Sequence, residues 1–192
     1  MWLPPQTTVA PTDVIIAPVA AKDYLRVDTS DDDQAVTDAV ADAVSHVESY
    51  TGTRLATQTV KLRTGSFGDL DHFPIGPVQS ISSITYLDAA GAEQTLDPDS
   101  YELFGAGLES GIRSAINVTW PITRQVKDAI SVTAVVGYGA AADVPRAVRR
   151  AVLLLVGDYY QSREDTIAER SVVPATLPNG VDTLLANHRI YG

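Results

Sequence analysis

The fold is decided by residues Asp31–Thr64, which have the sequence DDDQAVTDAVADAVSHVESYTGTRLATQTVKLRT. Apolar residues recur in its first part at spacings of three and four, which predicts an amphipathic helix over residues 31–51. These residues are Val36, Val40, Ala43, Val44 and Val47. Gly52 follows, as is common just beyond a helix end. Residues 54–64 then alternate apolar and polar side chains, which predicts a β-strand. The stretch therefore predicts a helix that leads directly into a sheet.

Three consecutive carboxylates, Asp31, Asp32 and Asp33, stand at the start of this helix. Ser30 or Asp31 is expected to cap it, and carboxylates in the first turn face the positive end of the helix dipole. A divalent-cation site is the alternative, but such sites need oxygens that converge from spaced positions. Capping is therefore the preferred interpretation. Further along, three acidic residues lie off the apolar stripe and are expected to face water. They are Asp38, Asp42 and Glu48.

Residues 54–139 are predicted to form a small antiparallel β-module, either a sheet or a barrel. The segment 88–92 (DAAGA) has the composition of a hairpin turn, and residues 65–76 are expected to be a loop. The predicted strands, in chain order, are 54–64, 78–87, 94–96, 101–104, 111–114, 117–120 and 129–137.

The helical period returns after Pro145, which predicts a helix over residues 145–162, and a shorter helix is expected at 19–26. The predicted fold class is therefore α+β. N-terminal and C-terminal helices pack together, a small antiparallel β-module is inserted between them, and extended arms form both ends of the chain. Residues 19–165 would be a single domain.

The predicted arms are residues 1–18 and residues 166–192, both of which carry prolines that disfavour regular helix. A short helix or tail is expected at 181–186 in the second arm. Isolated apolar residues in the arms are expected to order on a partner rather than on the chain itself. They include Trp2, Leu3, Val172, Val173, Leu184 and Leu185.

The charge of the chain is strongly and unevenly acidic. Its 192 residues include 24 Asp and Glu against 14 Lys and Arg, a net charge of −10. Residues 1–50 alone hold nine acidic and two basic residues. A nucleic-acid binder would need a cationic surface for the phosphates, and none is visible. The longest apolar run, 151–157, is far short of the ~18–20 residues of a membrane span, so we expect a soluble protein.

The residue types that carry catalysis or bind metals occur without the necessary spacing. The three histidines, His46, His72 and His188, fall in different predicted elements, and there is no cysteine. No serine lies in a G-x-S-x-G elbow, and no GK[ST] follows a glycine-rich loop. The sequence thus predicts no catalytic residue, no cofactor site and no metal site. An unrecognised enzyme is the least favoured alternative.

The only basic cluster is formed by Arg146, Arg149 and Arg150, which would lie on adjacent turns of the last long helix. It has two interpretations that the sequence leaves open. The cluster is either a solvated helix face or a docking surface for an acidic neighbour. Asp31–Asp33 of another copy of the chain would suit the second interpretation.

A series of short segments also occurs in an order typical of one protein family. They include AAKDYLRVD (20–28), VESYTGT (47–53), PVQSISSITY (77–86), AEQTLD (92–97), WP (120–121), VGYG (136–139), the helix 147–164 and LPNGV (177–181). Over residues 18–190 the chain resembles the head–tail connector (adaptor) proteins of tailed phages, which also occur in prophages and gene transfer agents.

The resemblance implies a structural virion protein that forms a ring of about twelve copies below the portal. The ring would join capsid to tail in the neck of a virion or phage-like particle that is assembled in the bacterial cytoplasm. Its partners would be other copies, the portal protein and a tail-side completion protein. DNA would pass through the ring without specific binding, and no membrane would be involved. Another head-completion layer, a stopper or a tail terminator, is the alternative.

The resemblance further implies that the C-terminal segment reaches the portal. The residues expected to form this portal-binding arm are Val172, Val173, Leu177, Leu184, Leu185, Ile190 and Tyr191.

Overall fold

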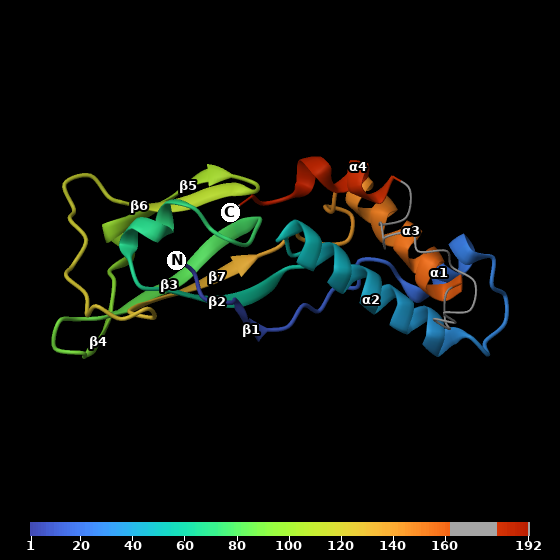
Figure 1. Ribbon diagram of the computed structural model, residues 1–192, viewed down its shortest axis with the longest axis horizontal. Coiled ribbons are helices and arrows are strands. Elements are labelled where there is room, and N and C mark those ends of the chain that lie inside the picture. Colours follow the sequence, from blue (N-terminus) through green and yellow to red (C-terminus); the bar gives the residue numbers. More distant parts are fainter. Residues whose placement is uncertain (162–179, 192) are drawn as a thin grey trace, which may run out of the picture.

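The helices gather at one end of an elongated molecule and the strands at the other (Figure 1). The structure, a computed structural model, describes residues 1–161 and 180–191. It confirms the α+β fold class. The helices in the described residues are α1 (Pro18–Leu25), α2 (Asp33–Thr51), α3 (Arg146–Gln161) and α4 (Val181–Leu185). The three long helices begin and end within two residues of the predicted bounds, except that the predicted last residue of α3, 162, lies outside the described residues.

Helix α2 forms because most of its apolar stripe is buried, with Val44 partly exposed. Five residues on one face are buried, and they are Val36, Ala39, Val40, Ala43 and Val47. The helix ends at Gly52, which adopts a φ of 72° and donates its N–H to the Glu48 carbonyl at 3.0 Å. Glycine takes this left-handed conformation without steric cost, so the stop predicted from the sequence is correct.

The start of α2 differs from the prediction that Ser30 or Asp31 caps it. The N-cap residue is Asp32, and its side chain makes no capping hydrogen bond. Its carboxylate instead accepts a hydrogen bond from the Tyr160 hydroxyl at 2.7 Å. Asp33, in the first turn, pairs with Lys22. Contacts with α1 and α3 thus compete successfully for the carboxylates that were expected to cap the helix.

Helix α2 packs against α3, and α3 packs against α4. Together with residues 15–16, these helices enclose one of two apolar cores, here called the helical core. Its largest members from the second half of the chain are Val148, Val152, Leu155, Val156, Val181 and Leu185. The stripe on α3 is the one that the helical period predicts.

The β-module is an open antiparallel sheet of order β1-β2-β7-β3-β4, so the barrel alternative is excluded. The strands are β1 (Gln6–Val9), β2 (Gln58–Thr64), β3 (Val78–Leu87), β4 (Glu93–Thr95) and β7 (Ile130–Val136). A separate hairpin is formed by β5 (Tyr101–Ala106) and β6 (Glu109–Ser114). In β2 and β7 every second residue is buried, which is the alternation that the sequence displays.

A second core lies between the sheet and the hairpin and is here called the sheet core. It includes Leu62, Phe67, Leu70, Phe73, Ile75, Ile84, Ile112, Ile130 and Val132. Phe67 and Leu70 come from a 3₁₀ turn (Phe67–Asp71) within the segment expected to be a loop. The turn expected at residues 88–92 is present, because the Asp88 N–H donates to the Ala92 carbonyl at 2.9 Å.

The strand predicted at 117–120 is absent. Asn117 adopts a φ of 64°, which is incompatible with a strand, and the chain turns there as Val118 donates its N–H to the Ala115 carbonyl at 3.0 Å. Trp120 stacks on Phe67, with ring centroids 4.6 Å apart. Of the apolar residues that suggested a strand, Val118 therefore lies in a turn and Trp120 packs at the edge of the sheet core.

The expectation that the N-terminal arm needs a partner is wrong, because residues 1–18 dock on their own chain. Trp2 packs against Phe73 and donates its indole N–H to the His72 carbonyl at 2.9 Å. β1 pairs with β2 at the sheet edge, and Ile15 and Ile16 are buried in the helical core. The segment is extended as predicted and largely exposed, but Trp2 and β1 anchor it to the sheet half and Ile15 and Ile16 anchor it to the helical half.

Candidate functional site

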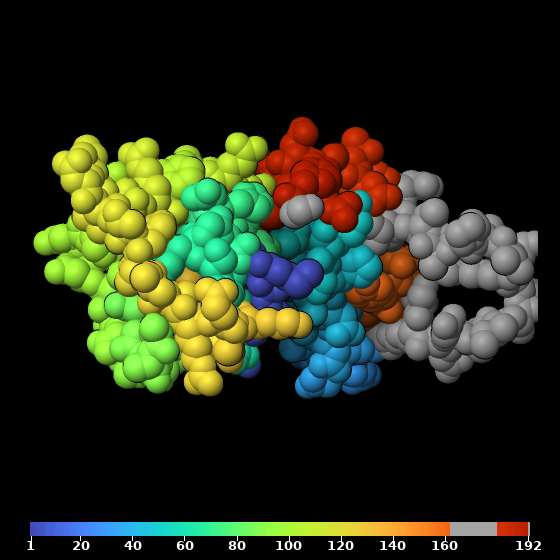
Figure 2. Space-filling model, turned by 60° about the vertical axis from the view of Figure 1, so that its left-hand side comes forward, coloured from blue at the N-terminus to red at the C-terminus, as the bar shows by residue number. Residues whose placement is uncertain are grey.

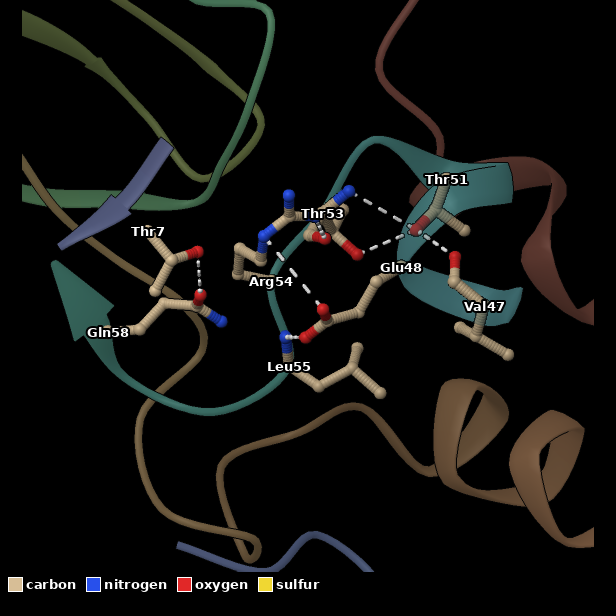
Figure 3. Close-up of polar contacts among 8 residues, drawn as sticks. All are labelled: Thr7, Val47, Glu48, Thr51, Thr53, Arg54, Leu55 and Gln58. Atoms are coloured by element: carbon tan, nitrogen blue, oxygen red, sulfur yellow. Dashed lines mark hydrogen bonds and ion pairs between the residues drawn. The ribbon is translucent and has the colours of Figure 1, made fainter. Parts of the chain in front are cut away.

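A polar cluster joins the two halves of the molecule where α2 leads into the sheet (Figure 3). Glu48 accepts the Leu55 N–H at 2.8 Å, and its other oxygen lies 3.8 Å from Nε of Arg54. The Thr51 and Thr53 hydroxyls are 2.7 Å apart and buried. Glu48 was expected to face water, but it is largely covered. Burial raises its pKa, although the Leu55 N–H and the Arg54 guanidinium partly oppose this. Both carboxylate oxygens are engaged, so the cluster fixes the turn between the halves.

The described residues form no arrangement that resembles a catalytic or metal centre. Over residues 1–161 and 180–191, no three His, Cys, Asp or Glu side chains converge as metal ligands would. Nδ1 of His46 lies 2.7 Å from the Tyr159 hydroxyl, which joins α2 to α3. Within the same ranges, no helix is both long enough and apolar enough to cross a membrane.

The structure brings Arg146, Arg149 and Arg150 together on one flank of the helical half. With Ile16 and Leu153 they line an open hollow of about 270 Å³, here called the basic hollow. Its three guanidinium groups form no ion pair with any acidic residue in the described part of the chain.

Two of the guanidinium groups have distinctive surroundings. The Arg150 guanidinium lies over the Tyr24 ring, 5.3 Å from its centroid, where the electron-rich face of the ring attracts the cation. Nε of Arg149 is buried and has no hydrogen-bond partner among the described residues. The exposed guanidinium groups of the hollow are those of Arg146 and Arg150.

The acidic residues expected to be contacts are only partly free to meet a partner. Asp32 and Asp33 are engaged by Tyr160 and Lys22, as described above, whereas Asp31 is exposed. Asp38 and Asp42 are also exposed. At about 100° per residue, Asp38 and Asp42 lie roughly 40° apart around α2, whereas Asp31 precedes the helix. We call Asp38 and Asp42 the acidic face of α2.

The C-terminal segment 180–191 lies on its own chain, where α4 packs against α3 and the residues after it reach the C-terminal end of α2 (Figure 2). Leu185 is completely buried in the helical core, and Leu184 packs against it. Ile190 donates its N–H to the Thr51 carbonyl at 2.8 Å. The Tyr50 hydroxyl donates to the Asp182 carboxylate at 2.9 Å, and this bond raises the pKa of Tyr50.

These contacts correct the expectation that Leu184 and Leu185 are free to order on a partner. Of the proposed portal-binding residues in segment 180–191, Tyr191 is the most exposed, at 68%. Val172, Val173 and Leu177 lie outside the described residues. The sequence of the C-terminal segment carries too little periodicity to predict that Leu184 and Leu185 are buried. Residues 181–185 are too few to display a helical period, and their burial depends on α3, which is distant in the sequence.

Comparisons with known proteins identify the fold. No protein-family model matches the chain, and no curated protein matches it. Among solved structures it is similar to a chain of the neck of an empty gene transfer agent particle, computed with C6 symmetry. The two are 21% identical, the match covers 99% of this chain and 97% of that chain, and the TM-score is 0.76.

Two further solved structures agree with this match. A chain of the neck of a native gene transfer agent particle, computed with C12 symmetry, is 20% identical with a TM-score of 0.76. A chain of the virion of a native gene transfer agent particle is 21% identical with a TM-score of 0.73. Both matches cover 99% of this chain and 97% of the other. The resemblance noted in the sequence is therefore confirmed at the level of the fold.

Proposed function

We propose that this chain is a structural protein of the neck of a virion or gene transfer agent-like particle, where its copies form a ring that joins head to tail. One observation carries the proposal. The fold matches along 99% of the chain with chains of particle necks that were computed with sixfold and twelvefold symmetry. A fold that is shared over its full length, rather than in one subdomain, is best suited to the same architectural role.

The proposed role is not enzymatic, which agrees with the chemistry of the described residues. Glu48, a largely buried carboxylate, has both oxygens occupied at the junction of the two halves. His46, in turn, is bound to Tyr159. Neither is paired with a nucleophile, so both side chains hold elements together instead of acting on a substrate.

Within the neck, we place the ring directly below the portal, as an adaptor of about twelve copies assembled in the bacterial cytoplasm. A net charge of −10 per copy would surround the DNA path with negative charge, which repels phosphate. DNA would then slide through the ring without specific binding. A stopper or tail-terminator position is the competing assignment, and it predicts a different neighbour on each side of the ring.

The portal contact must use residues that the chain does not bury for itself. We therefore assign it to Tyr191 rather than to Leu185, and Val172, Val173 and Leu177, which lie outside the described residues, stay predicted contacts. Deleting residues 172–192 would remove Val181 and Leu185 from the helical core and would confuse loss of folding with loss of contact. The sharper variant is Val172→Asp with Val173→Asp. It should leave thermal unfolding unchanged and prevent incorporation into portal-bearing heads.

Electron microscopy of the particle that contains the chain tests the proposed function. Density for this fold should form a ring between the portal and the tail-side protein. Particles from cells that lack the chain should be filled heads without tails, and expression of the chain should restore the tails. A ring that touches the tail tube but not the portal would support the tail-terminator assignment. Density elsewhere in the particle, or none, would overturn the proposal.

A further inference from the structure

The basic hollow and the acidic face of α2 lie on different flanks of the helical half. On α3, Arg146, Arg150 and Leu153 lie within about 60° of one another, whereas Tyr159 lies some 120–180° around the helix. Tyr159 lines a separate hollow together with Asp42, Ser45 and Ser49 of α2. The basic hollow is lined by Ile16 and residues of α3 and by none of these.

The two charged surfaces do not pair within one copy, because no ion pair among the described residues joins them. Asp38 accepts a hydrogen bond from the neutral side chain of Gln34 at 2.8 Å, which leaves its charge unbalanced. Asp42, in turn, neighbours Tyr159 on the far side of α3. The charges therefore remain available to other molecules.

From these observations we infer that the basic hollow of one copy binds the acidic face of α2 of the next copy around the ring. The inference rests on the proposed ring and adds its contact. Asp38 and Asp42 would meet Arg146 and Arg150, the two exposed arginines of the hollow. Ile16 and Leu153 supply apolar area beneath the charges, which lowers the cost of excluding water from the contact.

The placement of the two surfaces is compatible with a ring. A twofold dimer could pair each basic hollow with the partner's acidic face only if one rotation brought both pairs together at once. When a single hollow meets a single acidic face, the other hollow and the other acidic face of the pair stay available for further copies, which is a head-to-tail contact. Head-to-tail contacts repeat from copy to copy, and they close into a ring when the rotation allows it.

Charge reversal tests the contact. We expect Arg149→Glu with Arg150→Glu to abolish ring formation, and Asp38→Lys with Asp42→Lys to do the same. Mixed in equal amounts, the two variants should form rings again, because each intact surface finds its complement and the two reversed surfaces attract one another. A chain that carries all four changes should also assemble. As a control, Arg124→Glu with Lys127→Glu makes the same change in net charge at exposed positions of the β-module and should have no effect.

Cross-linking in assembled particles gives an independent test, since the chain has no cysteine of its own. A chain with Arg150→Cys and Asp42→Cys should give a ladder of covalent multimers with a short bis-maleimide, while each single cysteine should give at most dimers. Salt should weaken the contact, because the charges are largely exposed.

The possible failures are distinguishable. An intact ring that yields only monomers, or that tolerates both charge reversals, would overturn the assigned contact and leave the proposed function standing. Cross-links to a different neck protein would identify the basic hollow as a site for that protein and would also overturn the assignment. Absence of the unaltered chain from the neck would overturn the proposed function itself.

Discussion

Replacement of Leu185 by alanine tests whether the C-terminal segment belongs to the fold of the free chain. Leu185 has no exposed surface and lies in the helical core against α3 and α2. The substitution removes three carbon atoms, each worth about 0.8 kcal/mol of transfer free energy. The cavity that remains adds to this loss. Measured Leu→Ala substitutions cost about 2–5 kcal/mol, and α4 is short enough to relax into part of the space, so we expect about 3 kcal/mol.

Thermal unfolding followed by circular dichroism measures this effect. For a chain of this length, about 3 kcal/mol corresponds to a decrease in melting temperature of roughly 6–12 °C. Thr183→Ala is the matched control, because Thr183 is exposed on the same helix and alanine favours helix. Its melting temperature should change little. If Leu185→Ala and Thr183→Ala have the same melting temperature, α4 does not pack in the free chain. The C-terminal arm would then be free to order on a partner, as the sequence suggests.

Three further predictions concern the junction and the sheet core. Burial raises the pKa of Glu48 from 4.5, so folding favours its protonated form. Stability from this group is complete below pH 4.5 and is lost as the pH rises through the folded-state pKa; Glu48→Gln should remove that loss in urea titrations between pH 4 and 8. Trp120→Ala should cost about 1–3 kcal/mol in the same assay, because it removes the ring stacked on Phe67. Gly105→Ala should cost about 1–3 kcal/mol, because the φ there is +81° and a Cβ would lie 2.0 Å from a carbonyl oxygen of the facing strand. Gly107→Ala, with open space around it, is the control and should cost less.

The sequence predicts the elements whose own residues carry the pattern. Helices α2 and α3 bury a stripe at spacings of three and four, and β2 and β7 bury alternate residues, so each can be read without its partners. β1 lacks such a pattern, because all four of its residues are exposed. Its position depends on main-chain bonds to the edge of β2, which its side chains do not encode.

The sequence predicts which charged residues cluster on α2 and α3, but not which of them contact other helices. The clustering of Arg146, Arg149 and Arg150 follows from helical spacing, and the structure agrees. The engagement of Asp32 by Tyr160 does not follow from spacing, since the two residues lie on different helices far apart in the sequence. The carboxylates assigned to a partner are therefore Asp38 and Asp42 rather than Asp32 and Asp33, which Tyr160 and Lys22 already bind. Local sequence could give the charge of α2, but not which of its carboxylates other helices would occupy.

Because the β-module is inserted between α2 and α3, the ribosome makes α2 well before it makes α3 and α4. β2, β3 and β7 are all present once residue 136 has left the ribosome, so the sheet can pair early. Residues 15–16 and α1 precede α2 and cover part of its apolar stripe, but its main partner, α3, follows it by roughly 5–20 s at ordinary rates of synthesis. We therefore expect nascent chains that end before residue 146 to combine a paired sheet with a partly uncovered apolar helix. These are the chains that chaperones should bind.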